Sequence, residues 1–120
     1  MADEITLVTT LSVRNGNNVF SWSPGALTID QAAVGGPTPG YVTIGTSEES
    51  IAFGELSTQG VLCMQNLDAT NYVRWGFSTG VYGGRLMPGE YASFRLNPGS
   101  TLYLVANTEA CKCVVYALEN

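Results

Sequence analysis

The chain has 120 residues, of which 45% are hydrophobic and 12% are charged, and its formal net charge is −5. This length predicts one domain over residues 1–120 with a packed core. The acidic balance and the presence of one lysine, Lys112, argue against nucleic-acid binding, which needs clustered Lys and Arg, and against an anionic-membrane patch.

Histidine is absent from the sequence. In small all-β enzymes histidine usually ligates the metal or acts as the general base. We therefore expect a non-enzymatic protein without cofactor or metal. The charged share is about half of the usual ~25%, which predicts that neighbouring subunits cover part of the surface; the alternative is a monomer with a Ser, Thr, Asn and Gly surface.

The N-terminus, Met1-Ala2-Asp3-Glu4, is acidic where a secretory signal is basic and then apolar. No apolar run approaches the ~18 residues of a membrane span. The three cysteines, Cys63, Cys111 and Cys113, fit reduced thiols better than a disulfide framework. The sequence thus predicts a complete product that folds in the cytosol.

The N-terminal third alternates with a period of two, which predicts strands. Residues 5–13 place Ile5, Leu7, Thr9, Leu11 and Val13 on one face. Asn15-Gly16-Asn17-Asn18 predicts a hairpin turn. Residues 19–22 predict the return strand, which ends at Pro24-Gly25, and residues 26–34 alternate weakly.

The middle of the chain begins with a loop at residues 35–40, whose two prolines and three glycines exclude a helix or a central strand. Four further strands are predicted, followed by a second loop at residues 80–84. The predicted strands are residues 41–46, 50–56, 60–67 and 72–78.

Two Pro-Gly pairs, Pro88-Gly89 and Pro98-Gly99, lie ten residues apart and predict type II turns on either side of a strand at 91–96. A strand at 101–107 follows. Residues 111–118 are rich in Cys, Val and Tyr and predict a last strand, although Thr108 as a cap allows a helix there. Eight or nine short strands predict an antiparallel β-sandwich with jelly-roll-like topology, or a small barrel.

No set of residues predicts catalysis. Cys111-Lys112-Cys113 supplies two thiols on one strand face, short of the four ligands of structural zinc. Glu48-Glu49 is an adjacent carboxylate pair and falls in a polar turn. The loop at 80–84 lacks the lysine and helix of a phosphate-binding loop.

Aromatic and arginine side chains predict an interface instead. If Val73, Trp75 and Phe77 face the core, together with Ala92, Phe94 and Leu96, an outward patch of Tyr and Arg results, and both residue types are enriched at interface hot spots. The interface candidates are Tyr72, Arg74, Tyr91, Arg95, Ile5 and Leu7. Trp22, Trp75 and Tyr82 are candidates for sugar stacking.

The stretch 60–120 resembles small tailed-phage virion proteins, in particular head decoration (cement) proteins. The residues that carry the resemblance are Gln65-Asn66-Leu67-Asp68, Tyr72-Val73-Arg74-Trp75-Gly76, Leu86-Met87-Pro88-Gly89-Glu90 and 95–103, from Arg95-Leu96-Asn97-Pro98-Gly99 to Tyr103. The resemblance implies a jelly-roll or β-tulip fold, a homotrimer seated on the outer capsid surface, and no catalytic residues.

The leading hypothesis is therefore a bacteriophage capsid decoration protein, made in the host cytoplasm, whose partner is the major capsid protein. Its contacts with the shell would come from residues 3–13 or from the loops at 35–40 and 79–84. The alternative is a carbohydrate- or receptor-binding module such as a tail-fibre domain. A cytosolic enzyme subunit is the third hypothesis.

Overall fold

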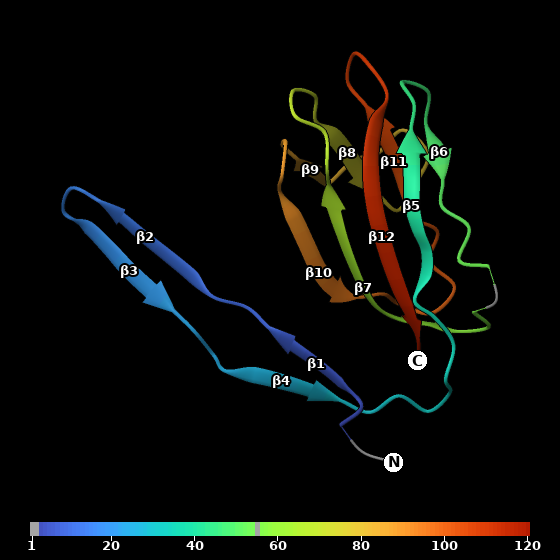
Figure 1. Cartoon of the computed structure of the whole chain (residues 1–120), viewed down its shortest axis with the longest axis horizontal. Coiled ribbons are helices and arrows are strands. Elements are labelled where there is room, and N and C mark those ends of the chain that lie inside the picture. Colours follow the sequence, from blue (N-terminus) through green and yellow to red (C-terminus); the bar gives the residue numbers. More distant parts are fainter. Residues whose placement is uncertain (1–2, 55) are drawn as a thin grey trace. The chain divides into compact units, whose positions relative to one another are not determined.

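The computed structural model describes residues 3–54 and 56–120, and these are all-β, with antiparallel pairing throughout (Figure 1). The chain consists of two compact units, Met1–Ala32 and Ala33–Asn120. The all-β class expected from the alternating pattern is confirmed. The single domain over residues 1–120 stays a prediction.

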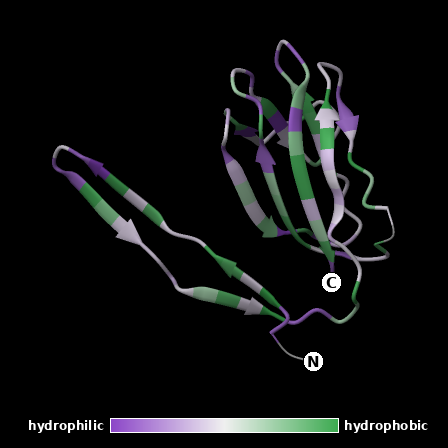
Figure 2. Ribbon diagram, viewed as in Figure 1, coloured by the Kyte–Doolittle hydropathy of each residue, from purple (hydrophilic) through white to green (hydrophobic). Residues whose placement is uncertain are grey.

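The N-terminal unit is a two-stranded antiparallel ribbon made of nested strand pairs, the outer pair β1·β4 and the inner pair β2·β3. The predicted turn at Asn15–Asn18 closes the inner pair, with Gly16 at a φ of 57° that glycine adopts without steric cost. Figure 2 shows apolar and polar residues alternating along these strands. The bounds are β1 Ile5–Val8, β2 Leu11–Asn15, β3 Asn18–Trp22 and β4 Ala26–Ile29.

The second unit is a β-sandwich of two four-stranded sheets. One sheet has the order β10-β7-β12-β5 and the other β6-β11-β8-β9. The bounds are β5 Thr38–Ile44, β6 Glu49–Ser50, β7 Gln59–Asn66, β8 Val73–Gly76, β9 Gly84–Leu86, β10 Tyr91–Arg95, β11 Tyr103–Ala106 and β12 Cys111–Glu119.

The core lies between the two sheets, because each sheet turns its apolar residues toward the other. Leu62 and Val115 come from one sheet and Val73 and Leu104 from the other, and none of the four is more than 1% exposed. Such packing of two inner sheet faces is the usual basis of sandwich stability. The predicted core set is largely confirmed: Val73 and Leu96 are buried, and Trp75, Ala92 and Phe94 pack against the core, whereas Phe77 is 44% exposed.

Both Pro-Gly turns have the predicted form. Glu90 N–H donates to Met87 O at 2.9 Å, and Ser100 N–H donates to Asn97 O at 3.0 Å. Gly89 and Gly99 have φ of 81° and 85°, the value that the third position of a type II turn requires. The predicted C-terminal strand is also confirmed, as β12.

Four other predictions need correction. The described residues contain twelve strands instead of eight or nine. The strand expected at 50–56 is reduced to β6, and β9 begins at Gly84, inside the loop expected at 80–84. The loop expected at 35–40 ends earlier, since β5 begins at Thr38; Pro39 is tolerated because β5 lies at a sheet edge. No helix of the described residues could span a membrane.

Candidate interaction surfaces

The inner half of the ribbon has one apolar face at the surface. Opposite residues of an antiparallel pair project from the same face, so Leu11 joins Trp22 and Val13 joins Phe20. We call these four residues the ribbon face; their side chains are between 36% and 57% exposed. The other side of the same strands carries the pairs Ser12–Ser21 and Arg14–Val19. The inner half is therefore amphipathic.

The outer half of the ribbon repeats this arrangement with more burial. Ile5 pairs with Ile29 and Leu7 with Leu27 on one face. Ile5 is only 7% exposed and Leu7 is half-buried, so these two sequence-based candidates offer less surface than the ribbon face does.

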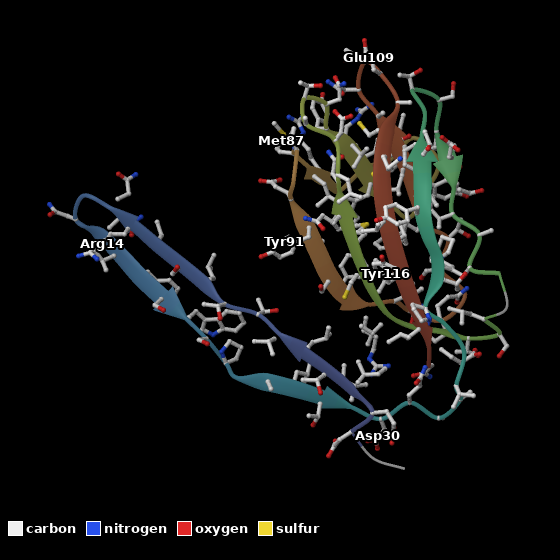
Figure 3. All side chains as sticks on the ribbon, in the orientation of Figure 1. Arg14, Asp30, Met87, Tyr91, Glu109 and Tyr116 are labelled. Carbon is white, nitrogen blue, oxygen red and sulfur yellow. The ribbon has the colours of Figure 1, made fainter. Side chains whose placement is uncertain are left out.

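A second weakly charged surface is the outer face of the sheet β10-β7-β12-β5. Tyr91, Gln65, Val114 and Tyr41 form one row across the four strands. Tyr91 and Tyr41 are 76% and 71% exposed, and Tyr116 projects from the neighbouring row (Figure 3). This row carries no charge.

The single outward patch expected from Tyr72, Arg74, Tyr91 and Arg95 is wrong. Tyr72 directly precedes β8 and Arg74 lies in it, whereas Tyr91 and Arg95 lie in β10. These strands belong to different sheets, and the residues project from the two outer faces of the sandwich. The faces of each strand were predicted correctly, but the pattern of one strand does not reveal which sheet the strand joins.

Arg74 instead lies beside Arg85, a residue that the sequence analysis did not identify as a candidate. The two are register partners on β8 and β9, and each guanidinium lies over a tyrosine ring, Tyr82 for Arg74 and Tyr72 for Arg85. Only the strand register brings the two arginines together, and nothing in the local sequence signals it.

Glu48 fixes the loop that carries Tyr82. Its Oε1 accepts hydrogen bonds from Tyr82 Oη–H and from Gly80 N–H, the latter at 2.7 Å. These bonds lower the pKa of Glu48, chiefly through the Tyr82 hydroxyl, and the same bond raises the pKa of Tyr82. At neutral pH the carboxylate therefore stays ionised and the phenol protonated. Glu48 thus has a structural partner in the loop that carries Tyr82.

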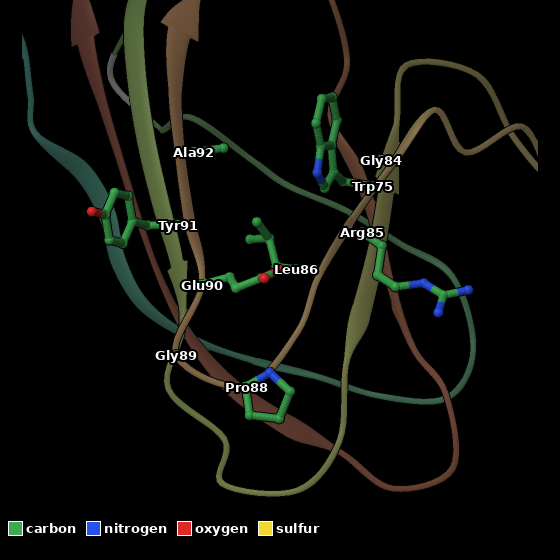
Figure 4. A pocket seen from close by; sticks show the side chains of 9 residues that line it. All are labelled: Trp75, Gly84, Arg85, Leu86, Pro88, Gly89, Glu90, Tyr91 and Ala92. Carbon is green, nitrogen blue, oxygen red and sulfur yellow. The ribbon is translucent and has the colours of Figure 1, made fainter. Parts of the chain in front are cut away.

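The three sugar-stacking candidates have different surroundings within their own units. Trp22 belongs to the ribbon face, and the Tyr82 ring faces Arg74. Trp75 stacks on Phe94 with 5.3 Å between ring centroids and borders an open pocket of about 700 Å³ (Figure 4). Leu86, Ala92 and the Pro88-Gly89 turn line the same pocket. Within the sandwich, Trp75 and Tyr82 thus border different pockets.

The cysteines are free thiols. Burial raises the pKa of Cys113 to about 12 and raises that of Cys111 as well. Both thiols stay protonated at neutral pH, and a protonated thiol is a poor nucleophile. Within residues 3–54 and 56–120 no group of three or more Cys, Asp or Glu is placed to hold a metal ion.

Comparison of the chain with family models, with curated proteins and with solved structures gave no match.

Proposed function

We propose that this protein is a non-enzymatic structural protein of a virion, a capsid decoration protein that binds the outer surface of the shell and stabilises it. The observation that carries the proposal is the ribbon face, a set of large apolar side chains that remain at the surface of the isolated chain. An isolated two-stranded ribbon is only marginally stable in water. Clustered surface apolar residues usually mark a docking site.

The energetics favour several ribbons acting together. Covering a half-exposed Leu, Phe or Trp gains about 1–2 kcal/mol, so the four residues of the ribbon face gain roughly 4–8 kcal/mol. Association costs about 4–15 kcal/mol. One ribbon alone binds weakly, whereas three ribbons linked in a homotrimer gain the avidity of simultaneous contacts. A trimer on three-fold positions of the shell supplies this linkage.

The strand pairing supports a jelly roll, the fold that the resemblance to decoration proteins implies. In the sandwich β5 pairs with β12, β6 with β11 and β8 with β9, and β7 pairs with β10. The first strand of the sandwich thus pairs with the last, the second with the second-to-last, and so on inward to the adjacent strands β8 and β9. Rolling one long antiparallel hairpin into two sheets gives this pattern.

The weakly charged outer face of the sheet β10-β7-β12-β5 supports contacts between copies in the trimer. Tyrosines are enriched in interface centres, where charged residues are depleted. Light scattering across a dilution series measures the mass of the free protein. A stable trimer supports this arrangement, and a strict monomer at all concentrations contradicts it for the free protein.

The test of the function is binding to expanded empty shells of the source virus, measured by co-sedimentation. We expect the wild-type protein to bind, and Phe20→Ser and Trp22→Ser to weaken binding at least tenfold. Val19→Ser is the matched control, since Val19 is 66% exposed on the same strand but lies on the opposite face. Thermal melts of all variants check that the sandwich remains folded.

Two results contradict the proposal. If the wild-type protein binds no shell of the source virus, the decoration function is wrong. If Val19→Ser weakens binding as much as Phe20→Ser does, the ribbon face does not carry the contact.

The alternative function, a carbohydrate-binding module, is favoured by the pocket beside Trp75 and by the half-exposed Trp22. A glycan array tests it. A hit that Trp22→Ala abolishes supports sugar binding by the ribbon. Trp75→Ala is less informative, because Trp75 also packs against the core and its loss destabilises the sandwich.

A further inference from the structure

Two arginines lie side by side on the outer face of the sheet β6-β11-β8-β9. Arg74 of β8 and Arg85 of β9 are directly opposite in the antiparallel register. Opposite residues of such a pair project from one face with Cβ atoms about 5 Å apart. Like charges in this arrangement repel each other and destabilise the sheet.

No carboxylate neutralises this pair within the described residues: the guanidiniums contact tyrosine rings and form no ion pair. The Arg74 guanidinium carbon lies 4.8 Å from the centre of the Tyr82 ring, and that of Arg85 lies 4.1 Å from the centre of the Tyr72 ring. A ring below a guanidinium limits its motion and leaves its N–H groups free to donate.

The loop beside Arg74 is held in place independently of any ligand. Glu48 accepts hydrogen bonds from Gly80 N–H and the Tyr82 hydroxyl, which fixes the ring over which Arg74 lies. Glu48 therefore orders the segment from Gly80 to Tyr82 without a bound ligand.

The arginines border an open depression of about 470 Å³. Glycines form much of its wall, namely Gly80, Gly83 and Gly84, together with Tyr82. A Cβ added at Gly80 or Gly83 would meet no atom within 4 Å, so the space beside these two glycines is open. The depression accepts a group larger than a single ion.

We propose that Arg74 and Arg85 form an oxyanion-binding site that takes a carboxylate or phosphate group of a small molecule between the two guanidiniums. Arginine donates paired hydrogen bonds to both kinds of group. An anion between the two charges also removes their repulsion, and the two rings hold the guanidiniums ready for it. The site lies in the sandwich, so this inference does not rest on the proposed function of the ribbon.

The experiment follows the arginine Nε–Hε signals of the full chain by NMR while inorganic phosphate or acetate is added at constant ionic strength. We expect saturable shifts of Arg74 and Arg85 with a dissociation constant on the order of 1 mM, as for two charge-assisted contacts at a surface. The two titrations distinguish the sources: saturation by phosphate alone assigns a phosphate ligand, and saturation by acetate assigns a carboxylate.

Three variants make the test specific. Arg74→Gln and Arg85→Gln should weaken binding at least tenfold. Arg95→Gln should leave it unchanged, because Arg95 lies on β10 of the other sheet and donates to Asn120 Oδ1 at 3.0 Å. Shifts that rise linearly without saturation with both anions, or that persist in Arg74→Gln and Arg85→Gln, would overturn the proposal.

Thermal stability gives a second readout. Without phosphate in low salt, Arg85→Gln should raise Tm, because it removes the repulsion between like charges. Phosphate should raise the Tm of the wild type and of Arg95→Gln more than that of Arg85→Gln. Phosphate also stabilises proteins in general, so an equal rise in all three proteins would count against a specific site.

Discussion

Asn66 is a buried polar residue whose hydrogen bonds connect separate parts of the sandwich. It is fully buried at the end of β7. Its Nδ2 donates to Asn71 O at 2.9 Å and to Leu86 O at 3.1 Å, and its Oδ1 accepts from Asp68 N–H at 2.9 Å. One side chain thereby joins β7 to the following loop and to β9 of the other sheet.

We expect Asn66→Ala to lower the free energy of unfolding by about 2–3 kcal/mol, because it leaves two buried carbonyls and one amide without a partner. Urea denaturation measures this. Gln65→Ala is the control, since Gln65 is the adjacent residue and makes one exposed hydrogen bond to Gly89 O. Similar losses for both variants would mean that the buried network contributes little.

Glu119 gives the sandwich a dependence on pH. Its Oε2 accepts from Thr58 N–H at 2.7 Å and from Ser57 N–H and Oγ–H, each at 2.9 Å. These bonds, first that of Thr58, hold the pKa of Glu119 below its ordinary value. A lowered carboxyl pKa stabilises the fold above the unfolded pKa, and this stabilisation is lost as the pH falls through the folded pKa.

Glu119→Gln should therefore lower Tm at pH 7, and the difference from the wild type should shrink below about pH 4. Melts between pH 3 and pH 8 test this. Glu109→Gln changes the charge equally, but no hydrogen bond of the described residues involves the Glu109 carboxylate, so it should leave Tm unchanged at every pH. A difference at pH 7 that persists at pH 3 would exclude the titration of Glu119 as its cause.

Local sequence predicted some of these residue-level features and not others. The Pro-Gly turns were predictable because the dihedral angles of two adjacent residues define them. Asn66 and Glu119 were not predictable, since their partners Leu86 and Ser57 lie 20 and 62 residues away in sequence. Arg74 was a candidate from its strand face, but its combination with Arg85 depends on the pairing of β8 with β9.

At the scale of elements, the ribbon and the sandwich strands differ in what stabilises them. β7 and β12 are central in their sheet and have buried side chains on most positions, whereas every residue of β2 and β3 is exposed. The sequence predicted both kinds of strand from the same alternation. Alternation identifies an apolar face, but it does not say whether another layer covers that face.

Hydrogen exchange should reveal this difference. We expect the amides of β2 and β3 to exchange within seconds to minutes in the free protein, and those of β7 and β12 to be the slowest of the chain. Exchange followed by mass spectrometry of peptides from each strand measures this. Slow exchange of β2 and β3 at the lowest protein concentrations would mean that the ribbon is stable without a partner.

At the scale of the whole molecule, the core belongs to the second unit. The residues of the main core cluster extend from Ile44 to Ala117. Among the described residues, none from the ribbon contributes to this cluster. We therefore expect the stability of the ribbon to be separable from that of the sandwich.

Removal of residues 1–32 should therefore leave a folded sandwich with a Tm within about 5 °C of that of the full chain. Circular dichroism and calorimetry check this. The shortened protein should also lose binding to shells if the ribbon face carries the contact. Failure of residues 33–120 to fold would show that the ribbon contributes to the stability of the sandwich.

The pairing of β5 with β12 also has a consequence for synthesis. Among the described residues, Thr38–Ile44 pair with Cys111–Ala117, so this sheet cannot close until β12 has left the ribosome. The ribbon needs only nearby residues, emerges before the sandwich, and can form while the sandwich is still being made. For the time needed to make some ninety further residues, its apolar side chains meet other nascent chains and chaperones before any sandwich exists. Codons that slow translation near the C-terminus would lengthen this period and favour aggregation.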